Sequence, residues 1–417
     1  MSWARSDMDE EGASAWLSIV GIGEDGMAGL SAASRAALAR AEAVIGAPRH
    51  LGLLPADACS QAERMAWPAP FAAGIERLLA LRGRRVVMLA SGDPFWFGAG
   101  SVVARHLAPH EWTALPAPSV FSLAAARLGW ALERTPCVGL HAAPFERLRP
   151  QLAPGVRLLA LVRDGAAAGE LAAWLSARGF GASRLHVLEA LGGARERVRS
   201  MLAAEYGLED VQHPVAVGIE VDWNPAAADE ALIHRACGLP DACFAHDGQL
   251  TKRPMRALTL SALAPHPGEL LWDIGAGSGS IGIEWLLSHP ANEAIGFEAD
   301  PQRAGRAQAN ARTLGVDRLQ IVTGRAPEVL AGQPPPDAVF IGGGLSEALL
   351  LELWARLAPG TRVVANAVTL ESETLLAQWH VAHGGSLLRV ELAEAAPLGG
   401  RRGWKAAYPV VQWSVSR

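Results

Sequence analysis

The chain has 417 residues, a length that exceeds a usual single core and predicts two or three domains. Half of the residues are hydrophobic, and the formal net charge is −5 at pH 7. Basic residues are spread thinly and form no long run, which argues against a nucleic-acid partner. No apolar run is long enough to predict a membrane span.

The cysteines and the N-terminus give no sign of an oxidising compartment. The 4 cysteines form no C-x-x-C pair and show no zinc-ligand spacing, so we expect reduced thiols and no metal site. Residues 1–12 lack the basic segment and apolar stretch of a secretory signal. Together these features predict a cytoplasmic protein.

In the first half, apolar segments alternate with alanine-rich helical segments. This alternation is typical of parallel α/β sheets, in which helices connect successive strands. Prolines near residues 110–118 predict a division of this half into two parts. The predicted strands cover residues 16–22, 43–45, 85–90, 158–162 and 185–188, and the predicted helices cover residues 31–41, 119–128 and 169–178.

The regular alternation weakens between residues 199 and 250, where prolines interrupt the chain. Such segments are typical of the connections between domains. We place the junction near residue 212. The expected organisation is a first domain over residues 15–212, a connection over residues 213–245 and a second domain over residues 246–417.

The clearest motif lies early in the second half. An apolar strand, residues 269–274, carries Asp273, and Gly275-Ala276-Gly277-Ser278-Gly279 precede a predicted helix over residues 280–287. Glycines at such a turn let a ligand approach bare backbone beside the first N–H groups of the helix. A dinucleotide loop has the spacing G-x-G-x-x-G or ends in alanine, and Ser280 occupies that last position here. The spacing therefore disfavours a dinucleotide.

Two further residues follow the next predicted strands. Glu298 follows residues 294–297, where a carboxylate can accept hydrogen bonds from both hydroxyls of a ribose. Ala326 follows residues 318–322, where a class I methyltransferase holds adenine. The ordered set of Asp273, alternating glycines, Glu298 and Ala326 fits S-adenosylmethionine (SAM) best.

Candidates for the substrate side come from the last predicted strands, residues 337–341 and 362–365. In open α/β sheets, ligands bind beyond the carboxyl ends of the strands. Gly343, Asn366 and Thr369 follow these strands and are therefore candidates for contacts with the substrate.

The second half is similar to the decarboxylating precorrin methyltransferases of cobalamin biosynthesis. The similar segments are HDGQLTK (residues 246–252), LWDIGAGSGSIGIEW (271–285), PDAVFIGGG (336–344) and VVANAVTLESE (363–373). In that family a threonine, the glycine loop, an acidic residue and an alanine contact SAM. The resemblance places these contacts on Thr251, Gly275, Ala276, Gly277, Ser278, Gly279, Glu298 and Ala326.

The first half resembles the tetrapyrrole methylases, in which SAM lies between two α/β subdomains. The similar segments are VGIGEDG (residues 20–26), ASGDPFWFGAG (90–100) and LPAPSVFSLAAARLGW (115–130). Two departures are visible: Glu24-Asp25-Gly26 replace the P-G-D of the family pattern, and Ala117 replaces a glycine. The resemblance implies SAM contacts from Ser91, Gly92, Asp93, Ser119 and Val120.

The order of the two halves resembles the fused precorrin-6B methyltransferases over residues 16–417. This resemblance implies methylation of ring carbon 5 by the first half, methylation of carbon 15 by the second half with decarboxylation of the ring C acetate, and one SAM site in each half. A carbon nucleophile in an electron-rich macrocycle needs mainly alignment, so no catalytic side chain is assigned. The expected partners are the tetrapyrrole and a second copy of the chain, with neither nucleic acid nor membrane.

A substrate with many carboxylates should be bound by cations. Arg49 with His50, and Lys252 with Arg253, are candidates, although charges on a solvated surface explain each pair equally well. Trp96, inside a cofactor motif, is a candidate for packing against the macrocycle.

Three alternatives stay open at this stage. The enzyme could methylate another substrate, which would leave the first half unexplained. One half could be a non-catalytic SAM-binding scaffold, for which the altered Glu24-Asp25-Gly26 loop is the best argument. A nicotinamide-dependent dehydrogenase would bind a nucleotide that SAM cannot displace.

Overall fold

The computed structural model describes residues 15–227 and 232–417, so the segment considered for a secretory signal lies outside the described residues. Internal contacts divide the chain into two units: Met1–Ala143 with Ala153–Ala228, and Pro144–Leu152 with Asp229–Arg417. None of the helices in the described ranges has both the length and the apolar character needed to cross a bilayer.

The first sheet of the first unit contains five parallel strands in the order β3-β2-β4-β1-β5. Its central strands are almost fully buried, which explains their continuous apolar sequences. The sequence missed the short outer strands, which are mostly exposed or only half-buried. The strands are β1 (Leu17–Ile22), β2 (Ala43–Gly46), β3 (Glu63–Ala66), β4 (Val86–Ser91) and β5 (Trp112–Leu115).

The second sheet of this unit has the order β6-β7-β10-β8-β9, and only its β6–β7 pair is parallel. The expectation of parallel sheets throughout is therefore wrong here. A short turn joins β8 to β9, and such a hairpin forms an antiparallel pair without a crossover helix. The strands are β6 (Cys137–Gly139), β7 (Arg157–Leu161), β8 (Arg184–Glu189), β9 (Arg197–Leu202) and β10 (Val215–Glu220).

Strand β10 lies in the middle of the second sheet, between β7 and β8. The first unit consequently continues beyond residue 212, where the sequence placed the junction. The predicted break near residues 110–118 falls where β5 ends the first sheet, before helix α5. The helices of this unit are α1 (Ala32–Arg40), α2 (Pro48–Gly52), α3 (Phe71–Leu79), α4 (Ala99–Val103), α5 (Val120–Leu128) and α6 (Gly165–Ser176).

The second unit contains a seven-stranded sheet in the order β13-β12-β11-β14-β15-β19-β16. The first five strands are parallel, and β19 pairs antiparallel with both of its neighbours, β15 and β16. The chain order reverses between β11 and β14, the position at which open α/β sheets bind ligands. The strands are β11 (Leu270–Ile274), β12 (Glu293–Glu298), β13 (Gln320–Thr323), β14 (Ala338–Ile341), β15 (Arg362–Ala367), β16 (Ser386–Val390) and β19 (Val410–Ser416).

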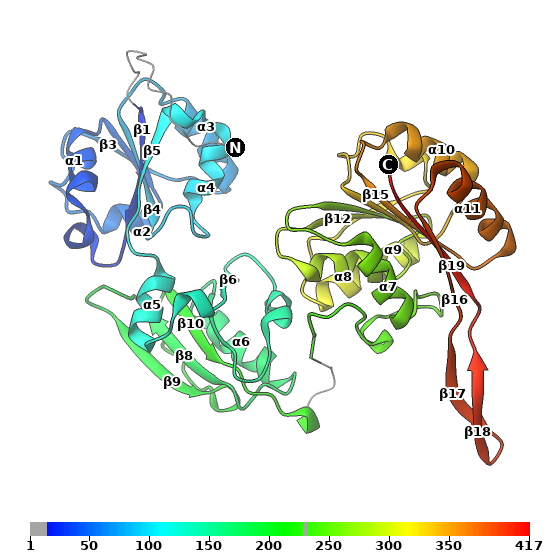
Figure 1. The fold of residues 1–417 in the computed structure, drawn as a ribbon. Helices are drawn as coiled ribbons and strands as arrows, with labels where there is room; N and C mark the ends of the chain where they lie inside the picture. The colour runs from blue at the N-terminus through cyan, green and yellow to red at the C-terminus, as the bar shows by residue number, and fades with distance from the viewer. Residues whose placement is uncertain (1–14, 228–231) are drawn as a thin grey trace. The chain divides into compact units, whose positions relative to one another are not determined.

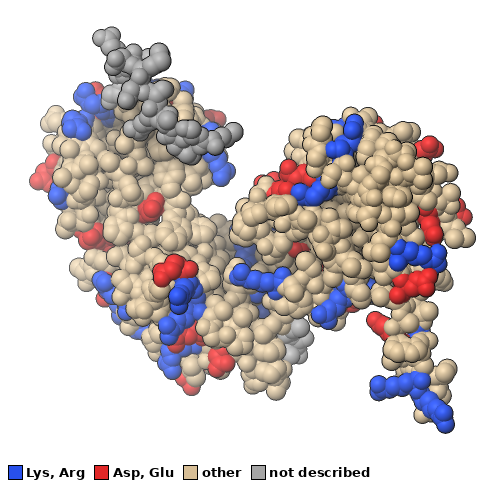
Figure 2. Space-filling view, in the orientation of Figure 1, with Lys and Arg blue, Asp and Glu red and all other residues tan. Residues whose placement is uncertain are grey.

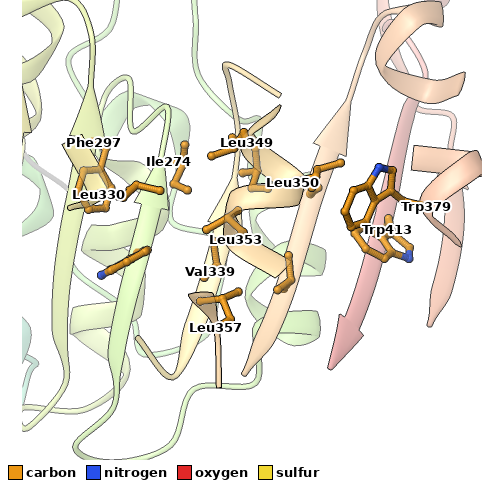
Figure 3. Packing of buried hydrophobic residues seen from close by; sticks show 14 of the residues in the cluster. Ile274, Phe297, Leu330, Val339, Leu349, Leu350, Leu353, Leu357, Trp379 and Trp413 are labelled. Carbon is orange, nitrogen blue, oxygen red and sulfur yellow. The ribbon is translucent and has the colours of Figure 1, made fainter. Parts of the chain in front are cut away.

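Helices cover both faces of this sheet (Figure 1). On one face, apolar side chains of the strands pack against α10 and α11, with Leu353, Trp379 and Trp413 in the core (Figure 3). On the other face, residues such as Leu271 and Phe340 pack against α7, α8 and α9. The helices are α7 (Arg253–Leu263), α8 (Ser280–Ser288), α9 (Pro301–Thr313), α10 (Glu347–Arg356) and α11 (Leu370–His383).

A two-stranded hairpin, β17 (Ala393–Leu398) and β18 (Arg401–Ala406), projects from the ends of β16 and β19 (Figure 1). Basic residues gather at its tip, whereas positive and negative side chains are interspersed elsewhere on the face shown in Figure 2. The hairpin carries exposed apolar side chains, among them Leu398 and Trp404.

Candidate functional site

A cavity of about 430 Å³ lies in the first unit. It brings together every residue that the sequence assigned to a site in this half. These residues come from the end of β4 and the loop after it, the N-terminus of α5 and helix α2: Ser91, Gly92, Asp93, Ser119, Val120, Arg49 and His50.

Close backbone contact joins the two segments of this cavity that the sequence assigned to the cofactor. Gly92 has φ +49°, and a Cβ atom there would lie 2.8 Å from the Pro118 carbonyl oxygen. Only glycine permits both this conformation and this approach. Ser119 begins helix α5 as predicted, and its hydroxyl accepts a hydrogen bond from Ser122 N at 3.0 Å. The first N–H groups of α5 therefore lie at the cavity.

Arg49 and His50 both reach the Ser91 hydroxyl. Arg49 Nη2 and His50 Nε2 each lie 2.8 Å from Ser91 Oγ. Burial, together with the nearby Arg49 guanidinium, lowers the pKa of His50 to about 4. His50 is therefore neutral at pH 7, and Arg49 is the charged member of the predicted pair.

Aromatic side chains line another part of the same cavity. Trp67 and Phe71 stack with ring centroids 4.8 Å apart, and Trp96 packs against Phe121 at 5.4 Å. Trp96 is 38% exposed, so its ring contributes to the cavity wall as well as to the core. Sequence reasoning missed Trp67 and Phe71, because they follow a short strand that carries no recognisable motif.

In the second unit, the glycine loop connects β11 to α8 as predicted. Gly275, Gly277 and Gly279 have φ values of +73°, +57° and +74°. A Cβ atom on Gly275 would lie 2.5 Å from Gly343 N. The loops after β11 and β14 therefore meet at the switch point of the sheet, and Gly343 borders the glycine loop.

Glu298 ends strand β12, beside this glycine loop. Its carboxylate accepts hydrogen bonds from Gly277 N at 2.8 Å and from Asp300 N at 3.0 Å. The residue is 7% exposed, so the carboxylate is held at the edge of the sheet rather than in bulk solvent. Acid and glycine loop are thus in direct contact, as the predicted cofactor site requires.

Asp273 is 1% exposed and supports the loop from below. Its Oδ2 atom accepts a hydrogen bond from Gly282 N at 2.9 Å in the first turn of α8. Burial raises the pKa of Asp273 to about 7, against the opposing effect of that hydrogen bond. Asp273 consequently fixes the start of α8 and has no direct opening to solvent.

Thr251 and Ala326 lie in the segments before α7 and after β13. The Thr251 carbonyl accepts a hydrogen bond from Arg256, a fully buried side chain of α7. Arg256 also donates to Glu284 Oε1 at 2.8 Å, which fastens this segment to α8. Ala326 packs at the border of the apolar core on the α10 side of the sheet.

The remaining substrate candidates have other partners in the fold. The sequence predicted that Asn366 lies in the loop after a strand, whereas the structure places it within β15. Its Nδ2 atom donates to Thr259 Oγ1 at 3.0 Å, and its Oδ1 accepts from Gln412 Nε2 at 2.9 Å. Thr369 is the N-cap of α11 and accepts from Ser372 N at 3.3 Å. Both side chains therefore have structural roles.

Within residues 15–227 and 232–417, no group of three or more His, Cys, Asp or Glu side chains could hold a metal ion. The charged candidates Lys252 and Arg253 lie at the start of α7, where Lys252 Nζ is 3.6 Å from Asp241 Oδ2.

Family models match both halves of the chain. Residues 17–206 match the tetrapyrrole (corrin/porphyrin) methylases, and residues 242–417 match the precorrin methyltransferase domain. The two matches follow one another in the order that the sequence motifs indicate.

Curated relatives cover the full length. A precorrin-6Y C(5,15)-methyltransferase [decarboxylating] from Sinorhizobium sp is 51% identical over 97% of this chain and 97% of that protein. One of the same name from Mycobacterium tuberculosis is 40% identical over 96% of this chain and 99% of that protein. A cobalt-precorrin-6B C(15)-methyltransferase (decarboxylating) from Salmonella typhimurium is 33% identical and matches 39% of this chain and 85% of that protein.

Among solved structures, the C-terminal domain of precorrin-6Y C5,15-methyltransferase from Rhodobacter capsulatus is 57% identical, covers 44% of this chain and 100% of that chain, and has a TM-score of 0.43. The full-length relatives and the two domain matches together identify the chain as a methyltransferase. It belongs to the family of the fused precorrin-6Y C(5,15)-methyltransferases (decarboxylating).

Proposed function

We propose that the chain methylates a precorrin-6 tetrapyrrole twice, at carbon 5 through its first half and at carbon 15 through residues 246–417, and decarboxylates the ring C acetate. Family membership supports the overall reaction, and the C(15)-methyltransferase from Salmonella typhimurium matches 39% of this chain. Each half would hold its own SAM. The observation that carries the proposal is the meeting of Glu298, the glycine loop and Gly343 at the switch point of the seven-stranded sheet in the second unit.

The residues of the second unit fit SAM in shape and in chemistry. Glycines at positions 275, 277 and 279 leave bare backbone at the N-terminus of α8. Glu298 presents a carboxylate that suits the two hydroxyls of a ribose. When bound, SAM supplies an activated methyl group.

The first unit contains a second candidate site for SAM. Its cavity of about 430 Å³ is within the range of small-molecule sites, and it is lined by Ser91, Gly92, Asp93, Ser119 and Val120. The missing Cβ of Gly92 lets two loops approach closely, and α5 directs its first N–H groups to the same place. These residues would bind and orient the donor in this half.

The protein's own contribution to methyl transfer is alignment and exclusion of water. A carbon nucleophile in a conjugated macrocycle needs a fixed distance and direction to the methyl group, and such positioning can lower a barrier by about 7–11 kcal/mol. Backbone contacts between the loops at Gly275 and Gly343 supply rigidity where the methylation of carbon 15 would occur. For the decarboxylation, the conjugated ring itself can accept the electron pair left by carbon dioxide.

Product analysis tests this proposal. Incubation of the full chain with SAM and precorrin-6Y should yield a tetrapyrrole that has gained two methyl groups and lost one carbon dioxide, detected by mass spectrometry. A chain inactive on this substrate but able to methylate another small molecule would refute the assigned substrate. A product with one added methyl group would refute the division of labour between the halves.

A further inference from the structure

A cluster of charged side chains lines one part of the first unit's cavity. Glu24 follows β1, in the position where the tetrapyrrole methylase pattern has proline. Its carboxylate is paired with Arg49 of α2 and with Arg195 of the β8–β9 turn, whose Nη2 lies 3.0 Å from Glu24 Oε2. The Glu24 side chain is 7% exposed, whereas that of Arg49 is 30% exposed. The acid is thus enclosed while both of its partners stay accessible, and of these two partners Arg49 lines the cavity.

This cluster contains more positive than negative charge. Two guanidinium groups face one carboxylate, and His50, the neighbour of Arg49, is neutral at pH 7. Because Arg195 compensates Glu24, the charge of Arg49 is not cancelled. A partly exposed guanidinium with an excess charge beside a cavity attracts one more carboxylate.

The other charged residues of the cavity wall have their own partners. The Asp93 carboxylate accepts a hydrogen bond from Phe95 N at 2.8 Å. Arg163 is paired with Asp164 at 2.8 Å and with Glu170 at 3.1 Å. Arg163 thus has two acidic partners of its own, whereas Arg49 shares its acidic partner with Arg195 and is better placed to bind a ligand.

The position of Arg49 favours the tetrapyrrole over SAM as the source of that carboxylate. In the first sheet, β2 lies between β3 and β4. The predicted cofactor loop follows β4, Arg49 follows β2, and Trp67 and Phe71 follow β3. Arg49 therefore stands between the cofactor loop and a stacked aromatic pair. A flat apolar ring with carboxylate side chains fits a wall on which an aromatic pair lies next to a guanidinium group.

We propose that Arg49 binds a carboxylate of the tetrapyrrole during methylation by the first half, and that Glu24 and Arg195 hold Arg49 in position and leave its charge available. This inference rests on the proposed function, because it names how the same cavity recognises its substrate. A substrate that loses carbon dioxide carries at least one carboxylate, and the forked guanidinium of arginine binds this group through two hydrogen bonds.

Variants of the full chain test the inference. With SAM carrying a ¹³C methyl group, NMR of the product separates the carbon-5 from the carbon-15 methylation. We expect Arg49→Gln to raise the tetrapyrrole KM of the carbon-5 reaction about 30-fold and Arg195→Gln to raise it about 5-fold, as expected for one lost charged contact and for its weakened support. Arg195→Lys should restore most of the affinity. Arg49→Gln should raise the tetrapyrrole KM more than the KM for SAM, because Arg49 also donates to Ser91 Oγ in the proposed cofactor site.

A matched control is Arg127→Gln, which breaks an exposed ion pair with Glu196 next to the same β8–β9 turn. Arg127 does not line the cavity, and its loss should leave both KM values unchanged. Titration of the tetrapyrrole without SAM, followed by absorbance, should show the same weakening in the Arg49 variant. Unfolding curves that match the wild type would show that the variants fold.

The outcomes separate this inference from the function on which it rests. If the wild type fails to methylate carbon 5, the proposed function of the first half is wrong. If the wild type is active and Arg49→Gln leaves the tetrapyrrole KM unchanged, the inference alone is wrong. An increase confined to the KM for SAM would also overturn it, because the carboxylate would then belong to the cofactor.

Discussion

Replacing Glu298 by alanine should abolish methylation at carbon 15 together with the decarboxylation, while methylation at carbon 5 continues. The carboxylate at the end of β12 is the group expected to accept hydrogen bonds from the ribose of SAM. Two charge-assisted hydrogen bonds contribute about 1.5–3 kcal/mol each, so SAM affinity in this half should fall more than about 100-fold. Mass spectrometry should then detect a product with one added methyl group and no loss of carbon dioxide.

Glu298→Gln and a control on the same strand separate cofactor binding from folding. Gly277 N and Asp300 N donate to different oxygens of the carboxylate, so glutamine keeps an acceptor for one of them and the loop stays partly supported while the charge is removed. Its loss of carbon-15 activity should be intermediate. Glu293→Ala changes an exposed acid at the other end of β12 and should alter neither reaction. If Glu298→Ala retained both activities, the assigned ribose contact would be wrong.

Gly275→Ala should also inactivate the second half, through a steric clash. The new Cβ atom would lie 2.5 Å from Gly343 N and 2.7 Å from Gly343 Cα, both of which are backbone atoms that cannot rotate away. The φ of +73° adds a cost of about 1–2 kcal/mol for any side chain, and forced packing adds about 1–3 kcal/mol. We expect a lower free energy of unfolding in urea and a loss of carbon-15 methylation of more than about 100-fold.

Gly332→Ala is the matched control for this substitution. Gly332 has a φ of +78° but no neighbouring atom within 4 Å of the position where a Cβ would lie. Both substitutions therefore carry the same backbone cost, and only Gly275→Ala carries the clash. Equal effects of the two variants on stability and on carbon-15 activity would contradict the view that the Gly275–Gly343 contact shapes the site.

Sequence reasoning succeeded where a local pattern reports a local structure. The buried strands β1, β4, β11 and β14 are continuous apolar segments, and the glycine loop has a spacing that few ligands share. The predicted fold class, with two methylase subdomains followed by a class I methyltransferase, is confirmed by the family matches and by the sheets. The family assignment is confirmed by the full-length relatives, whose names give precorrin-6Y where the motif comparison named precorrin-6B.

Sequence reasoning failed where the structure depends on contacts between residues that are distant in the chain. Nothing local indicates that β10 lies between β7 and β8, so the first unit extends past the expected junction. Asn366 belongs to β15 because β19, more than forty residues later, pairs with it there. The Glu24–Arg195 ion pair joins segments 171 residues apart, and no motif contains both of its members.

We expect one chain to carry two independent SAM sites, and calorimetric titration of SAM into the full-length protein measures their number. The wild-type chain should bind two equivalents and the Glu298→Ala chain one. A wild-type chain that binds a single equivalent would rule out two sites, because one half would then be unable to supply its methyl group.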